Sequence, residues 1–142
     1  MPEIADALIA EYNKNPVNNY EMKDCTVSRH EWNFICWDDL TVFLKIKDNI
    51  IEEFSFYGNP GQVSTASCSL LAEMIQWKDI DEVMTRWYDT FAQQWLDLLP
   101  RRRRAVVIGL LWVRNAIHEL RKDKKPGSDK ILVEEFEDIL ND

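Results

Sequence analysis

The three cysteines are the side chains of this 142-residue chain best suited to metal or sulfur chemistry, because a thiolate is both a nucleophile and a soft metal ligand. They stand at Cys25, Cys36 and Cys68. Their number is odd, and their spacing matches neither a disulfide framework nor the paired-cysteine pattern of structural zinc sites. The sequence also lacks an H-E-x-x-H motif, a nucleophile elbow, a phosphate loop and a nucleotide fingerprint. We therefore expect no enzyme with turnover of its own.

The individual candidates have structural explanations as well as functional ones. Cys68 lies about two turns into an expected helix, among apolar neighbours, which predicts a small buried residue. Cys25 and Cys36 are equidistant from His30-Glu31. A tight hairpin centred there would make them cross-strand neighbours in a two-thiol site, whereas a longer loop would separate them. His118 has arginines one turn to either side, which predicts a solvated surface histidine.

The segments that position these residues begin with one helix and three strands. Residues 2–13 carry apolar side chains three and four apart, which predicts an amphipathic helix. Strand-like sequence follows from residue 25, and residues 40–46 and 50–56 are β-prone on either side of the turn Asp48-Asn49. We expect a three-stranded antiparallel meander. The adjacent acids Asp38-Asp39 point to opposite faces of a strand and cannot share a substrate.

The pattern becomes helical after Gly61. Ser64 is the expected N-cap of a helix that stops near Trp77. Residues 80–98 give one or two further helices, and residues 105–120 form a long, mostly buried helix. This order of elements predicts an α+β fold, with helices packed on one face of a three-stranded antiparallel sheet.

Length and composition favour a single domain with its own apolar core. Hydrophobic residues make up 46% of the chain and aromatic residues 11%, which is enough apolar area to offset chain entropy. We expect this domain to span residues 1–122. Residues 123–142 would add a linker and an extra C-terminal amphipathic helix, packed on the domain or extending it.

The charge balance excludes two classes of partner. The chain has 17 basic and 25 acidic residues, a net charge of −8, which argues against nucleic acid and anionic membranes. The local exception is Arg101–Arg104, which we interpret as a solvated helix start. We identify no signal peptide and no apolar run of membrane-spanning length. The three cysteines also lack a disulfide pattern, and together these observations predict a cytoplasmic protein.

The stretch from Phe56 to Ser69 reads F-Y-G-N-P-G-Q-V-S-T-A-S-C-S. It resembles the F-x-G-x-G-C-x-I-S-x-A-S-x-S signature of the iron–sulfur scaffold family that includes IscU, SufU and the N-terminal domain of NifU. Three shorter segments agree: Asn15-Pro16-Val17-Asn18 with N-P-x-N, Cys36-Trp37-Asp38 with C-G-D, and Arg104, Leu110 and Trp112 with R-x-K-C-x-x-L-x-W. The resemblance runs from Asn15 to Ile117 and implies a SufE/NifU-like fold.

The resemblance also implies which residues should ligate metal. In that family three cysteines and the aspartate of C-G-D bind zinc or a nascent cluster. The present chain keeps Cys36 and Asp38, but has Gly61 at the second cysteine position and Val107 at the third, or Gly109 in an alternative register. Tetrahedral coordination needs about four donors, so one thiolate and one carboxylate make a weak, open site. We expect no bound cofactor, and weak binding of zinc, iron or an iron–sulfur cluster stays open.

These residues together predict a degenerate scaffold-like protein with a non-catalytic binding or accessory role in cluster assembly. The implied partner is a cysteine desulfurase or another cluster-assembly factor, and both a monomer and a homo-oligomer are compatible with the sequence. One alternative is a residual metal, cluster or persulfide sulfur carrier that uses Cys36 and Asp38. Another is a purely structural interaction protein, whose acidic helix over residues 131–140 docks on a partner or on Arg101–Arg104.

Overall fold

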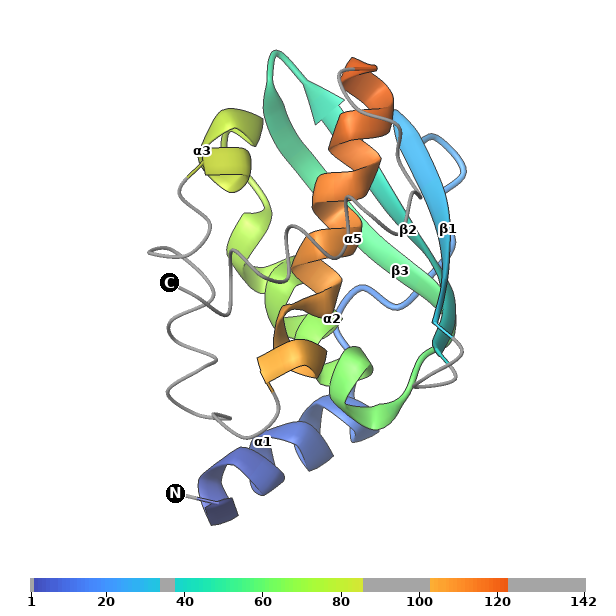
Figure 1. The fold of residues 1–142 in the computed structure, drawn as a ribbon. Helices are drawn as coiled ribbons and strands as arrows, with labels where there is room; N and C mark the ends of the chain where they lie inside the picture. Colours follow the sequence, from blue (N-terminus) through green and yellow to red (C-terminus); the bar gives the residue numbers. More distant parts are fainter. Residues whose placement is uncertain (1, 34–37, 86–102, 123–142) are drawn as a thin grey trace.

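The computed structural model describes residues 2–33, 38–85 and 103–122. In these residues a three-stranded antiparallel sheet of order β1-β2-β3 packs against helices (Figure 1). The elements are α1 (Pro2–Lys14), β1 (Val27–Asn33), β2 (Asp38–Lys47), β3 (Ile50–Asn59), α2 (Gln62–Ile75), α3 (Ile80–Thr85) and α5 (Arg103–Arg121). The predicted α+β meander is confirmed. The proposed helix within residues 123–142 lies outside the described residues.

The β2–β3 hairpin forms as its local sequence predicts. Asp48 and Asn49 have φ values of 53° and 66°, the left-handed conformation that a two-residue turn of this kind requires and that Asn and Asp tolerate. Along β2 the side chains of Leu40, Val42 and Leu44 are buried, because alternate residues of a strand share one face. That face is the inner face of the sheet.

The inner face is covered by α2 and α5, which run across it in Figure 1, while α1 packs against α2. The core is continuous from sheet to helices. Its largest fully buried side chains are Trp112, Phe54, Phe56, Leu40, Leu44, Ile51, Ile75, Leu111, Ile117 and Val42. Burying a side chain of this size stabilises the fold by about 1.5–3 kcal/mol before chain entropy is counted, so the elements around the site are held by apolar packing.

The first strand differs from the expectation. β1 is continuous from Val27 to Asn33 and pairs with β2 from Val27↔Leu44 to Asn33↔Asp38. A tight hairpin centred on His30-Glu31 is therefore wrong, because both residues are paired within the strand. Residues 34–37, which link β1 to β2 in the sequence, lie outside the described residues.

Candidate ligand positions at one end of the sheet

Asp38 and Gly61 mark the same end of the sheet. Asp38 is the first residue of β2 and pairs with Asn33, the last residue of β1. Asn59, the last residue of β3, pairs with Asp39, and Gly61 follows it by two positions. Cys36 belongs to the connection between β1 and β2, outside the described residues. The topology thus brings the backbone at two of the family's ligand positions to one edge, as the resemblance implies.

Gly61 begins α2 in place of the expected Ser64. It is the N-cap residue, with φ −69° and ψ 173°, and no side chain caps the helix. Its carbonyl oxygen accepts hydrogen bonds from the backbone nitrogen and the hydroxyl of Thr65, both at 2.9 Å. Ser64 lies inside the first turn and is buried. The prediction of Ser64 as N-cap is wrong, because the chain already turns into the helix at the glycine.

Gly61 is exposed and its φ is one that any residue can adopt. Glycine is not needed at this position for a left-handed backbone, in contrast to Gly58, whose φ is 146°. The backbone angles at Gly61 are therefore ones that a cysteine can also adopt.

The two candidates for the third position, Val107 and Gly109, both lie on α5. Gly109 is buried against α2. A Cβ atom there would stand 3.0 Å from Leu71 Cδ1 and 3.2 Å from both Cys68 Sγ and Ser67 Oγ. A side chain at position 109 would thus enter the α2–α5 packing. The side chain of Val107 lies outside the described residues.

The other two cysteines do not join this end of the sheet. Cys68 is fully buried in the core, which confirms the packing role predicted for it. Cys25 is half-buried and precedes β1 by two residues, whereas Cys36 follows its last residue, Asn33, by three. The strand between them is seven residues long and spans about 23 Å. The tight hairpin that would have made Cys25 and Cys36 cross-strand neighbours is wrong, since β1 continues through His30 and Glu31, and Cys36 itself lies outside the described residues.

A buried polar contact joins β1 to α5, and the sequence reasoning missed it. Arg29 and Glu31 form an ion pair on the inner face, with side chains only 13% and 10% exposed. Arg29 also reaches Glu119 of α5 at 3.5 Å. Burial raises the pKa of Glu31, and the charge of Arg29 and a hydrogen bond from Asn115 oppose the rise. The alternation of residues 27, 29 and 31 could have placed this pair on the inner face.

His118 also departs from the expectation. It is 5% exposed, so it is a buried residue of the α5 interface and not a solvated surface histidine. Helical spacing gave it two basic neighbours, but those neighbours do not fix which face of a helix meets the sheet. In α5 nearly every described residue from Gly109 to His118 is buried, so periodicity could not identify a solvent face.

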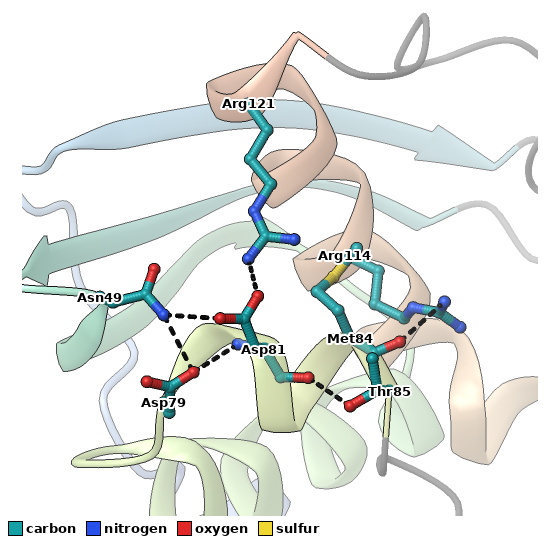
Figure 2. Close-up of polar contacts among 7 residues, drawn as sticks. All are labelled: Asn49, Asp79, Asp81, Met84, Thr85, Arg114 and Arg121. Atoms are coloured by element: carbon teal, nitrogen blue, oxygen red, sulfur yellow. Dashed lines mark hydrogen bonds and ion pairs between the residues drawn. The ribbon is translucent and has the colours of Figure 1, made fainter.

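The opposite end of the sheet is closed by hydrogen bonds and an ion pair, drawn in Figure 2. Asn49 of the β2–β3 turn donates its side-chain amide to Asp79 Oδ1 at 3.0 Å and to Asp81 Oδ2 at 2.9 Å. Arg121, the last residue of α5, forms an ion pair with Asp81, whose pKa it holds below the usual range. Nearby, Arg114 donates to the Met84 carbonyl oxygen at 3.3 Å. These contacts tie α3, α5 and the hairpin together, far from the candidate ligand positions.

The described donors do not make up the family's metal set. In residues 2–33, 38–85 and 103–122, no three His, Cys, Asp or Glu side chains are grouped so that they could hold a metal ion. Position 61 offers no side-chain donor at all. Among the helices that the structure describes, none combines the length and apolar character needed to cross a membrane.

Solved structures of other proteins share this architecture. The fold matches an iron–sulfur cluster assembly scaffold protein of the SUF system from Fervidobacterium islandicum, with a TM-score of 0.65 and 17% identity over 77% of this chain and 93% of that one. It matches the N-terminal part of a NifU-like protein from Brucella abortus with a TM-score of 0.66 and 14% identity, over 82% and 94% of the two chains. At these identities the likeness concerns the fold.

The sequence comparisons supply the family. The model described as the NifU-like N-terminal domain matches residues 5–126, so the chain belongs to this family of iron–sulfur cluster assembly scaffolds. It is 30% identical over 90 residues to the scaffold protein IscU 1 of Archaeoglobus fulgidus, covering 63% of this chain and 58% of the relative. It is 30% identical over 78 residues to the zinc-dependent sulfurtransferase SufU of Bacillus subtilis, covering 55% and 52%. The chain thus spans between half and three-fifths of the length of these two relatives.

Proposed function

We propose that this chain is a degenerate member of the scaffold family, which keeps the fold but acts as a non-catalytic binding or accessory protein in cluster assembly. The observation that carries the proposal is Gly61. Position 61 follows β3 at the end of the sheet where Asp38 begins β2, and glycine there has no ligand atom. With Val107 or Gly109 at the third position, only Cys36 and Asp38 of the family's ligand set remain.

Loss of two thiolates weakens metal binding beyond what the remaining pair can offset, because zinc and iron–sulfur clusters in proteins are held by about four donors, mostly thiolates. The retained features are those that specify the fold: the turn before α2, the buried serines of its first two turns and Trp112 in the core. A chain that keeps its fold and loses its ligands is suited to bind a partner of the assembly system. A cysteine desulfurase is the first partner to test.

Restoring the missing ligands gives the sharpest test. The wild-type chain, Cys36→Ser, and the double variants Gly61→Cys/Val107→Cys and Gly61→Cys/Gly109→Cys would be reconstituted with zinc without oxygen and analysed for metal. We expect less than about one-tenth of an ion per wild-type chain and about one per chain for one double variant. The packing of Gly109 against α2 favours the Val107 variant as the one that binds.

The proposal makes two measurements decisive. About one zinc ion per wild-type chain, lost in Cys36→Ser, would refute degeneracy and favour the residual carrier that uses Cys36 and Asp38. Calorimetry of the wild-type chain with the cysteine desulfurase of the same organism tests the accessory role. We expect a complex at micromolar concentration, and the absence of heat and of a complex by gel filtration would contradict that role.

A further inference from the structure

The outer face of the sheet, which α2 and α5 leave uncovered, is covered in part by other described residues of the chain. Residues 20–26 cross it on their way from the β3 edge to the start of β1. Tyr20 donates its hydroxyl to Glu53 of β3, and Lys45 of β2 donates to Asp24 Oδ2 at 2.9 Å. These contacts place the crossing segment over the half of the sheet near the β2–β3 turn. None of these contacts places a described residue over the half near Asp38.

The half of the outer face near Asp38 carries two large, exposed aromatic side chains. Trp32 of β1 is 59% exposed and Tyr57 of β3 is 50% exposed. Asp39 lies between them on β2: it is directly opposite Trp32 on one side, and Tyr57 pairs with Thr41, two residues further along β2. Opposite residues of a sheet have Cβ atoms about 5 Å apart and diagonal ones about 7–8 Å. Trp32, Asp39 and Tyr57 therefore form one patch, which we call the outer patch.

The charge of the outer patch identifies its complement. Of its three residues, only Asp39 is charged, and the Asp39 side chain is 57% exposed. One oxygen of Asp39, Oδ1, is engaged by His30 Nε2, and the carboxylate has a second oxygen, Oδ2. A guanidinium could pair with that oxygen while it stacks on the neighbouring aromatic rings, since arginine combines planar stacking with carboxylate binding.

A second copy of this chain is a poor occupant. The described outer-face and crossing residues carry four carboxylates, at Glu21, Asp24, Asp39 and Glu53, against two lysines, at Lys23 and Lys45. Two such faces would repel each other, and the whole chain has a net charge of −8. Like charges placed face to face disfavour an interface, whereas opposite charges favour it. The complement of this face is therefore basic.

We propose that the outer patch docks a second protein through an exposed arginine on a basic surface, which stacks on Trp32 or Tyr57 and pairs with Asp39. Exposed aromatic residues and arginine are the side chains that most often dominate the energy of protein interfaces. The patch borders the end of the sheet where Asp38 begins β2, so a partner bound there would lie beside the remnant ligand positions. That this partner is a cluster-assembly factor rests on the proposed function, whereas the outer patch itself does not.

The test uses the full chain and its cognate cysteine desulfurase. Calorimetry at low and high salt would compare wild type with Trp32→Ser, Asp39→Asn and Tyr57→Ser. The matched control is Trp77→Ser, since Trp77 is 71% exposed and belongs to the segment after α2, which bonds to β3 beside the β2–β3 turn. We expect each patch variant to weaken binding about three- to thirtyfold, the control to bind like wild type, and added salt to weaken the wild-type complex.

A second measurement separates failure of the inference from failure of the proposed function. The probe is a short synthetic peptide that alternates arginine and leucine, compared with its lysine counterpart, and the readout is the NMR spectrum of the protein. We expect shifts centred on Trp32, Asp39 and Tyr57 that are larger for arginine. If the desulfurase does not bind but the peptide shifts the patch, the outer patch stands and the proposed partner is wrong.

Three results would overturn the assignment of the outer patch. In the first, the desulfurase binds the patch variants as tightly as wild type. In the second, neither the desulfurase nor the arginine peptide perturbs the patch. In the third, sedimentation reveals a wild-type dimer that Trp32→Ser disperses, which would make a second copy the occupant. Circular dichroism and thermal unfolding of each variant confirm that a lost interaction is not lost folding.

Discussion

Replacing Arg29 by methionine is the most direct way to test the contact between β1 and α5. The Arg29–Glu31 ion pair is almost out of solvent, with side chains 13% and 10% exposed. Removing one partner from a buried pair costs about 3–5 kcal/mol, because the other charge is left uncompensated. Asn115 still hydrogen-bonds Glu31 and some solvent reaches the site, so we expect a loss near the lower limit, about 3 kcal/mol, at pH 8.

The loss of unfolding free energy in Arg29→Met should become smaller as the pH falls. Burial already raises the pKa of Glu31, and the charge of Arg29 is the main opposing cause, so the variant should have a higher folded pKa still. A carboxyl group whose folded pKa is raised stabilises the protein below its unfolded pKa, and that stabilisation is lost as pH rises through the folded pKa. Between the folded pKa of Glu31 in wild type and its higher folded pKa in the variant, each unit of acidification should return about 1.4 kcal/mol to Arg29→Met relative to wild type.

The assay is urea unfolding of wild type and variant at several pH values from 8 to 5. Other groups near the pair also titrate or carry charge, namely His30 on β1 and His118 and Glu119 on α5, so the quantity compared is the difference between variant and wild type. Lys45→Met is the control, because it breaks an ion pair whose partner Asp24 is largely exposed. We expect for it a much smaller loss with no such recovery, since exposed pairs contribute little.

Two results would refute the reasoning. One is a loss for Arg29→Met below about 1 kcal/mol, the range of exposed pairs. The other is a loss that is equal at pH 8 and pH 5. The double variant Arg29→Met/Glu31→Leu adds an independent check, because an apolar pair in place of a buried ion pair is often neutral or stabilising. It should recover most of the stability at pH 8.

Further predictions concern single positions. Gly58→Ala should lose about 2 kcal/mol or more in urea unfolding, because its φ is 146° and a Cβ would stand 2.5 Å from a backbone oxygen of β2; wild-type stability would contradict this. Asn49→Gly keeps the turn but loses the amide hydrogen bonds to Asp79 and Asp81, which should lower the free energy of unfolding by about 1 kcal/mol. Asn49→Ala should lower it more, because alanine resists the left-handed conformation. Burial and a neighbouring glutamate raise the pKa values of Tyr12 and Tyr20 to about 12. In an absorbance titration, Tyr12→Phe and Tyr20→Phe should therefore each lack one tyrosine component near pH 12 that wild type shows. Loss of a component near pH 10 would refute the assignment.

Local sequence predicted the parts of the fold that depend on neighbouring residues. The Asp48-Asn49 turn forms because both residues tolerate a left-handed backbone, and β2 buries alternate residues because strand periodicity requires it. Cys68 packs in the core as its apolar helical neighbours indicate. The start of α2 was misplaced by three residues, because a serine is a good cap in isolation but the chain turns at Gly61 when β3 ends.

The sequence by itself determined the fold class, the family resemblance and the glycine at position 61 of the matching motif, since each of these is read from residue types at fixed spacing. Only the tertiary structure decided how far β1 extends, and hence that no tight hairpin is centred on His30-Glu31. It also decided that Arg29, Glu31 and His118 are buried and that Trp32 and Tyr57 remain exposed. The physical reason is that burial depends on which distant segment covers a face, and local periodicity carries no information about that partner.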